Sequence, residues 1–129
     1  MVAGLKGGMD SAAVRRLMGP PDSISADEDS RNPGAKLIAW HYRDIIVELG
    51  SYNSLGGVEI IGPTTATARG LRVGDSPGRV RELYPTDCAG DDGSECQLEY
   101  PRDRGGLTAM VISFAQGKVK SIYLGHLYD

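Results

Sequence analysis

The chain has little cysteine, few large aromatic residues and no excess of positive charge. Among its 129 residues are 2 cysteines, one Trp, one Phe and six Tyr. Its 14 Lys and Arg stand against 17 Asp and Glu, which gives a formal net charge of -3 at pH 7. Binding to a phosphate backbone depends on a positive field, and this chain does not supply one. We therefore expect no nucleic-acid partner.

Long apolar runs are also missing. No stretch approaches the roughly 18 apolar residues that cross a bilayer, so we expect no membrane span. Residues 1–10 lack the basic and apolar parts of a signal peptide, and for an exported protein we expect the signal to have been removed. Apolar residues nevertheless make up 40% of the chain and charged residues 24%, a balance typical of folded globular proteins. The length suits one ordinary domain or two small units that share a core.

An internal repeat is the strongest pattern. Residues 4–17 match residues 70–83 without gaps, and Gly, Leu, Gly, Val, Arg and Leu coincide at six positions. Each copy is typical of a glycine turn followed by a short helix, with Asp10 or Ser76 as the N-cap residue and Pro77 in the first helical position. Apolar residues at helical spacing form one stripe on each helix: Val14, Leu17 and Met18, then Val80, Leu83 and Tyr84. Such short helices do not persist alone in water, so we expect them to dock on strands.

Strands are predicted after each helix. Their ranges are 36–42, 45–49 and 58–61 in the first half, and 96–100, 108–114 and 119–124 in the second. Segments 23–34 and 87–95 are predicted as surface loops, and the aperiodic segment 63–69 as a linker. The predicted fold is therefore α+β, with tandem repeats at 1–62 and 70–129. Each repeat is a short helix, or two, packed on a three- to four-stranded antiparallel meander.

The arrangement of glycine turn, N-cap and Val-x-x-Leu, followed by Gly19-Pro20-Pro21-Asp22, an aromatic strand and a hairpin, resembles the helix-plus-meander unit of the β-lactamase inhibitory protein superfamily. The small lipoprotein of the outer-membrane barrel-assembly machinery is similar to one such unit. The resemblance covers nearly the whole chain as two tandem copies and brings no catalytic motif. It implies a concave, aromatic-rich sheet face that binds a protein, and a hairpin loop that reaches into a target enzyme. That loop corresponds to residues 51–54, which include Tyr52 and Asn53.

The two cysteines lie close together in the sequence. Cys88 and Cys96 enclose an acidic, glycine-containing segment, and their spacing suits a disulfide that ties a turn to the start of a strand. A disulfide predicts an oxidising location, namely secreted, periplasmic or cell-envelope. Two free thiols in a cytoplasmic protein are the alternative. His41 and His126 lack metal-ligand spacing to these cysteines, so no metal is predicted there. Residues 91–95 are typical of a solvated acidic loop, with a calcium site as the lesser alternative.

Catalytic chemistry requires a nucleophile, a base and an orienting group, and the sequence does not indicate such a set. Ser11 and Ser76 are explained by helix starts, and His41 by a strand position. Glu48 and Glu59 are candidates for a carboxylate pair across adjacent strands, but solvent-facing positions explain them equally well. We therefore predict no enzyme activity and no cofactor.

A protein-binding role is the remaining interpretation, because Trp, Tyr and Arg dominate the hot spots of protein interfaces. The candidate binding residues lie on or beside the predicted strands and loops: Trp40, His41, Tyr42, Arg43, Tyr52, Asn53, Tyr100 and Tyr123. Core packing stays open as an alternative for each aromatic residue. We predict a non-catalytic module that binds a protein of unknown identity, with an enzyme inhibitor as the form that the resemblance implies.

Two alternatives stay open at this point. One is an assembly factor of the cell envelope that associates with itself through a sheet face or free edge strands. The other is a small-molecule or enzymatic site between the repeats. The expected oligomeric state is a monomer or a weak homodimer.

Overall fold

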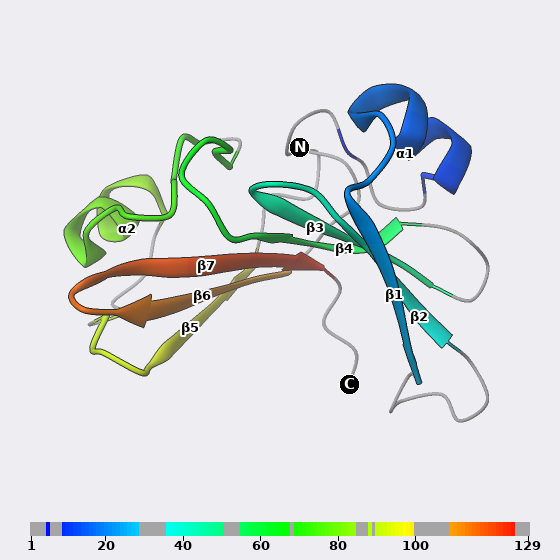
Figure 1. Cartoon of the computed structure of the whole chain (residues 1–129). Coiled ribbons are helices and arrows are strands. Elements are labelled where there is room, and N and C mark those ends of the chain that lie inside the picture. Colours follow the sequence, from blue (N-terminus) through cyan, green and yellow to red (C-terminus); the bar gives the residue numbers. More distant parts are fainter. Residues whose placement is uncertain are drawn as a thin grey trace.

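The chain folds as a mixed α and β structure, which confirms the predicted α+β class (Figure 1). The computed structural model describes residues 5, 9–28, 36–50, 55–67, 69–84, 88, 90–99 and 109–125. The described helices are α1 (Ser11–Met18) and α2 (Pro77–Leu83). The strands are β1 (Ser23–Glu28), β2 (Lys36–His41), β3 (Ile45–Leu49), β4 (Leu55–Ile60), β5 (Glu95–Glu99), β6 (Ala109–Ala115) and β7 (Lys118–Gly125).

All described strands belong to one seven-stranded sheet with the order β1-β2-β3-β4-β7-β6-β5. Every neighbouring pair is antiparallel. The strands after α1 and the strands after α2 are joined by the pairing of β4 with β7, in which Val58 lies opposite Leu124 and Ile60 opposite Ile122. These four side chains are buried, so the two halves of the sheet share one core.

Both helices begin as the sequence predicts. The Asp10 carboxylate accepts a hydrogen bond from the N–H of Ala13 at 2.8 Å, and the Ser76 hydroxyl accepts one from Arg79 at 3.2 Å. Val14 and Val80 are fully buried in the common core. Because both valines enter the same core, α1 and α2 cover the same face of the sheet, the upper face in Figure 1.

One residue of the predicted apolar stripes lies outside the core. Leu17 of α1 is 48% exposed, whereas Met18 is partly buried against the core. Residues four apart lie almost above one another on a helix, so Val14 and Met18 mark the buried line and Leu17 lies on its flank.

The core is built by alternation along the strands. In β3 the side chains of Ile45, Val47 and Leu49 are buried while those between them are half-buried. In β6 the corresponding buried residues are Met110, Ile112 and Phe114. Each fully buried side chain of this size contributes about 1.5 to 3 kcal/mol relative to its exposed state.

Segment 23–34 was predicted as a loop, and for its first six residues that prediction is wrong. Ser23–Glu28 forms β1, which pairs with β2 from Ser23 opposite His41 to Glu28 opposite Lys36. The run Ser-Ile-Ser-Ala-Asp-Glu has one β-branched apolar residue, and its described side chains are exposed. Backbone pairing to β2 therefore holds this strand, and side-chain periodicity gives no signal for it.

The segment predicted as a linker, 63–69, makes specific contacts with α2. Thr67 is 5% exposed, and its hydroxyl lies 2.7 Å from the hydroxyl of Tyr84 and accepts a hydrogen bond from the N–H of Leu71 at 3.1 Å. The guanidinium of Arg69 lies 5.1 Å above the Tyr84 ring and donates to the carbonyl of Leu83. A single buried threonine and one arginine thus anchor a stretch that has no apolar periodicity.

Candidate protein-binding face

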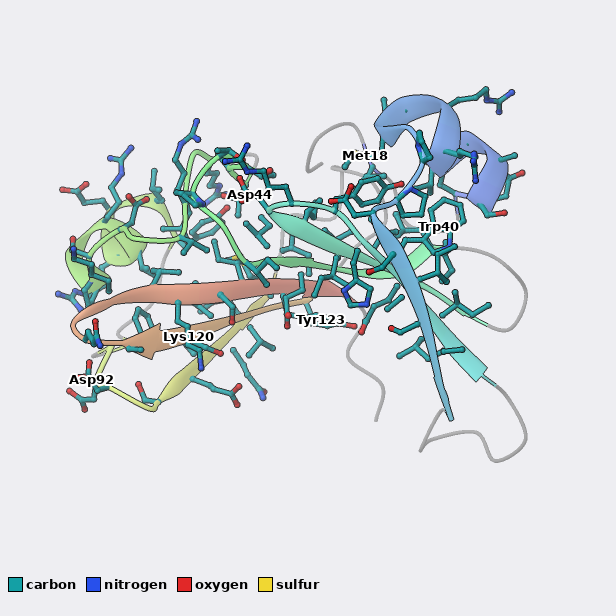
Figure 2. All side chains as sticks on the ribbon, in the orientation of Figure 1. Met18, Trp40, Asp44, Asp92, Lys120 and Tyr123 are labelled. Carbon is teal, nitrogen blue, oxygen red and sulfur yellow. A yellow bond between two sulfur atoms is a disulfide. The ribbon has the colours of Figure 1, made fainter. Side chains whose placement is uncertain are left out.

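The face of the sheet opposite α1 and α2 is not covered by any described helix, and we call it the open face. Register assigns residues to it, since side chains alternate between the two faces of a strand. Its central members come from neighbouring strands: Ala39, His41, Ile46, Glu48, Gly57, Glu59, Ser121, Tyr123, Val111 and Ser113. Figure 2 shows Tyr123 and Lys120 below the strands, on the side away from the helices.

Two carboxylates lie near the middle of the open face. Glu48 is opposite Gly57 and Glu59 is opposite Ile46, so the two glutamates are diagonal neighbours on adjacent strands. Burial raises the pKa of Glu59 above its ordinary value of 4.5, and the charge of Glu48 raises it further. The positive charge of Lys120 acts in the opposite direction. The two glutamates that the sequence suggested as a carboxylate pair therefore lie on one face and are partly desolvated.

Tyr123 lies across two facing glycines. Gly57 and Gly125 are opposite each other in the β4–β7 pair. A Cβ atom on Gly57 would lie 2.5 Å from the Tyr123 hydroxyl oxygen and 2.7 Å from Oε1 of Glu48, and a Cβ on Gly125 would lie 2.6 Å from the Tyr123 ring. The two glycines therefore leave the space in which the phenol and the Glu48 carboxylate come together.

The role of these two glycines was not predicted from the sequence. The strand was predicted to begin at residue 58, but β4 begins at Leu55 and includes Gly56 and Gly57. Gly57 lies next to Tyr123 because β4 pairs with β7, and this pairing joins segments more than sixty residues apart. No local pattern contains that information.

His41 lies at the end of β2, next to the edge strand β1. Its Nε2 lies 2.9 Å from the hydroxyl of Ser25 on β1, and the tautomer of His41 decides which of the two donates. Arg43 is exposed just beyond the end of β2. Of the candidate binding residues that the structure describes, His41 and Tyr123 lie on the open face.

Trp40 and Tyr42 lie on the helix side. Trp40 is opposite Val47 and only 8% exposed, so the core-packing alternative holds for it. Tyr42 is half-buried and donates a hydrogen bond of 2.8 Å to the carbonyl of Gly19, just after α1. Burial raises the pKa of Tyr42; Arg15 lowers it, and Asp22 raises it. The candidates Tyr52, Asn53 and Tyr100 lie outside the described residues.

Cys88 and Cys96 form a disulfide, with their Cα atoms 6.0 Å apart, as their spacing predicts. Cys96 is buried in β5 and Arg81 of α2 donates to the carbonyl of Cys88 at 2.9 Å, so the bridge ties this segment to the sheet and to the helix. In the acidic turn between the two cysteines, Asp92 accepts a hydrogen bond of 2.7 Å from the N–H of Gly117. Asp92 thus fastens the β6–β7 turn.

A shallow pocket of about 320 Å³ lies at the β5 end of the open face, lined by Gly93, Ser94, Glu95, Ser113, Phe114 and Lys120. Ligand pockets are mostly apolar, with a few polar groups. This lining is mostly polar and has one aromatic residue. The lining therefore differs from that of a typical ligand pocket.

Two further observations concern metal ligands and membrane spans in the described part of the chain. No group of three or more His, Cys, Asp or Glu side chains there is placed to hold a metal ion. None of the helices in that part has the length and apolar character needed to cross a bilayer.

Comparison with protein-family models, with curated proteins and with solved structures gives no match to this chain.

Proposed function

We propose that the chain is a non-catalytic protein-binding module and that the open face is its binding surface. The main support for this proposal is that the described helices cover only one face of the sheet. The other face carries Tyr123, His41 and a carboxylate pair. Protein interfaces are enriched in aromatic residues such as tyrosine and have a polar rim, and Tyr123 is half-buried near the middle of this face. An inhibitor of a target enzyme is the specific form that the family resemblance supports.

We further propose that the module consists of two tandem repeats, at 1–62 and 70–129. Equivalent positions of the two segments have equivalent roles. Leu5 and Leu71 are both fully buried, and Val14 and Val80 likewise. The N–H of Leu55 in β4 donates to the carbonyl of Met9, and the N–H of Val119 in β7 donates to the carbonyl of Asp75, in front of each helix.

The repeat also accounts for the open face. Each helix precedes a meander, and β4 and β7, the last strands of the two meanders, pair with each other in the centre of the sheet. Two equivalent halves joined in this way place both helices on one face. The other face, formed by both halves, is left for a partner.

An enzymatic alternative has one feature in its favour, the Ser25–His41 contact. A serine nucleophile needs its histidine oriented by a third group. Among the described residues, no carboxylate bonds to the other ring nitrogen of His41. Ser25 also lies exposed on an edge strand, where water is not excluded. These observations favour binding over catalysis.

The disulfide supports an extracytoplasmic location, secreted or in the cell envelope, because cytoplasmic thiols are kept reduced. Targets are therefore sought among exported proteins.

The experiment is photo-crosslinking with benzoylphenylalanine in place of Ser121 on the open face, and separately in place of Arg79 on the exposed side of α2. Both proteins are incubated with extracts of secreted and envelope proteins. We expect a discrete protein adduct from position 121 and none from position 79. Adducts of equal yield from both positions, or none from position 121, would contradict the proposal.

A further inference from the structure

The two edges of the sheet differ in how they are protected. The edges are β1 and β5. An edge strand exposes a row of backbone N–H and C=O groups, and proteins block such edges with charge, proline, bulges or covering segments. The state of each edge therefore indicates whether another strand can add to the sheet.

The β5 edge carries several of these protections. Its sequence Glu-Cys-Gln-Leu-Glu has an acidic residue at both ends, and Cys96 in its second position is bonded to Cys88. Cys88 is in turn held by Arg81 of α2. A second β5 strand placed against this edge would meet like charges and a tethered chain.

The first four residues of the β1 edge carry none of these protections. Ser23, Ile24, Ser25 and Ala26 are uncharged, contain no proline and are all exposed. Ile24 is 58% exposed, the largest value among the large apolar side chains that the structure describes as exposed. None of the described strands other than β2 pairs with β1. The acidic residues of this strand, Asp27 and Glu28, are confined to its C-terminal end.

We propose that β1 pairs antiparallel with β1 of a second copy of this chain, with Ile24 at the two-fold axis. In this register Ile24 lies opposite its own copy, and cross-strand apolar pairs stabilise a sheet. Asp27 and Glu28 of the two copies then lie at opposite ends of the strand pair, so like charges do not face each other. In a parallel pairing the two acidic ends would lie side by side.

Because only the β5 edge is protected, the assembly is limited to two copies. A two-fold interface uses the same surface on both copies and closes after two. With β5 protected, the assembly stops at a dimer in which the two seven-stranded sheets form one continuous sheet. A two-fold axis perpendicular to the sheet keeps both open faces on the same side. The pairing is therefore compatible with the proposed binding function and does not depend on it.

The first test is the mass of the full chain in solution, by sedimentation or light scattering, over a range of concentrations. The paired segment is short, so we expect a dissociation constant between about 1 and 100 μM. Ile24→Lys places two ammonium groups at the two-fold axis and is expected to weaken the dimer at least about tenfold. Leu17→Lys is the matched control: it changes an apolar side chain of α1 that is 48% exposed and is expected to leave the dimer intact.

A second readout is a crosslink. Directly opposite residues of antiparallel strands have Cα atoms about 4.5 to 5.5 Å apart, which a disulfide can span. Ile24→Cys is therefore expected to form a covalent dimer on mild oxidation, while Leu17→Cys stays monomeric. A mass of 13.7 kDa at every protein concentration up to about 1 mM would overturn the proposal. A dimer with the expected dissociation constant would be populated at that concentration. Equal weakening by the two lysine variants, or equal crosslinking of the two cysteine variants, would overturn it as well.

Discussion

The hydroxyl oxygen of Tyr123 lies 2.5 Å from the position that a Cβ atom on Gly57 would take. Oε1 of Glu48 lies 2.7 Å from the same position. A phenol from β7 and a carboxylate from β3 thus occupy the space above a glycine of the strand between them. The absence of a side chain on β4 is what brings these two groups of the open face together.

Gly57→Ala is expected to push Tyr123 and Glu48 away from β4. Only the ends of two side chains must move, so the free energy of unfolding is expected to fall by about 1 kcal/mol, the low end of the range for added methyl groups. Denaturant unfolding measures this loss, and the NMR shifts of Tyr123 report the displacement. Gly56→Ala is the control, because its Cβ meets no atom within 4 Å. Equal Tyr123 shifts in the two variants would disprove the packing described for Gly57.

Glu59 gives the protein a stability that falls as pH rises. The pKa of Glu59 is raised in the folded state by burial and by Glu48, so the folded protein holds this proton more tightly than the unfolded chain does. The favourable contribution is complete below pH 4.5, the ordinary pKa, and is lost as pH rises through the folded pKa. Glu59→Gln removes the charge, so its Tm is expected to exceed that of the natural protein at pH 7 and to match it near pH 4.

The control for this pH effect is Glu82→Gln on α2. Glu82 is exposed and pairs with Arg79 at 3.2 Å, and exposed pairs of this kind contribute little. Its variant is expected to show no rise of Tm at pH 7. A Tm difference for Glu59→Gln that stays constant from pH 4 to pH 7 would show that the carboxyl is not desolvated as described.

Thr67→Val tests the anchoring of segment 63–69. The substitution keeps the shape of the side chain but removes the oxygen shared by the Tyr84 hydroxyl and the N–H of Leu71. Buried groups that lose a partner cost about 1 to 3 kcal/mol, and the unfolding free energy is expected to fall by that amount. Thr65→Val in the same segment serves as the comparison, because the Thr65 hydroxyl bonds to none of the described residues. Similar losses from both substitutions would refute a specific role of Thr67.

Val14→Ala and Val80→Ala test whether the two halves are one cooperative unit. Both side chains are fully buried at equivalent positions of the proposed repeats. Each variant is expected to lose about 2 kcal/mol, from two methyl groups and the cavity that they leave. Unfolding followed by Trp40 fluorescence, which reports the first half, and by far-UV circular dichroism should give one coincident transition in each variant. If Val80→Ala left the Trp40 transition unchanged while shifting the other, the halves would be independent.

The helices could be predicted because their signals are local. Asp10 and Ser76 stand at the N-cap, and Val14 and Val80 follow at the same spacing in each copy. The disulfide followed from a short loop between the two cysteines. In these cases the residues that make the contact lie within about one turn or one loop of each other, so the sequence contains the whole pattern.

The features that could not be predicted depend on pairing between segments that are far apart in the sequence. β1 was missed because an exposed edge strand without apolar alternation is held by backbone hydrogen bonds. The division of Trp40 and His41 between two faces follows from alternation, but which face is covered depends on where the helices dock. The meeting of Tyr123 with Gly57 requires the β4–β7 register, which nothing in either strand determines alone.

Binding of a partner to the open face is tested by the affinities of two matched variants for the protein captured from position 121. Tyr123→Ala removes the aromatic side chain in the middle of that face, and Arg79→Ala removes an exposed side chain from α2. Titration calorimetry is expected to show at least about tenfold weaker binding for Tyr123→Ala, as for an interface hot spot, and an unchanged Kd for Arg79→Ala. Unchanged binding by Tyr123→Ala, or a loss confined to Arg79→Ala, would show that the partner does not bind to the open face.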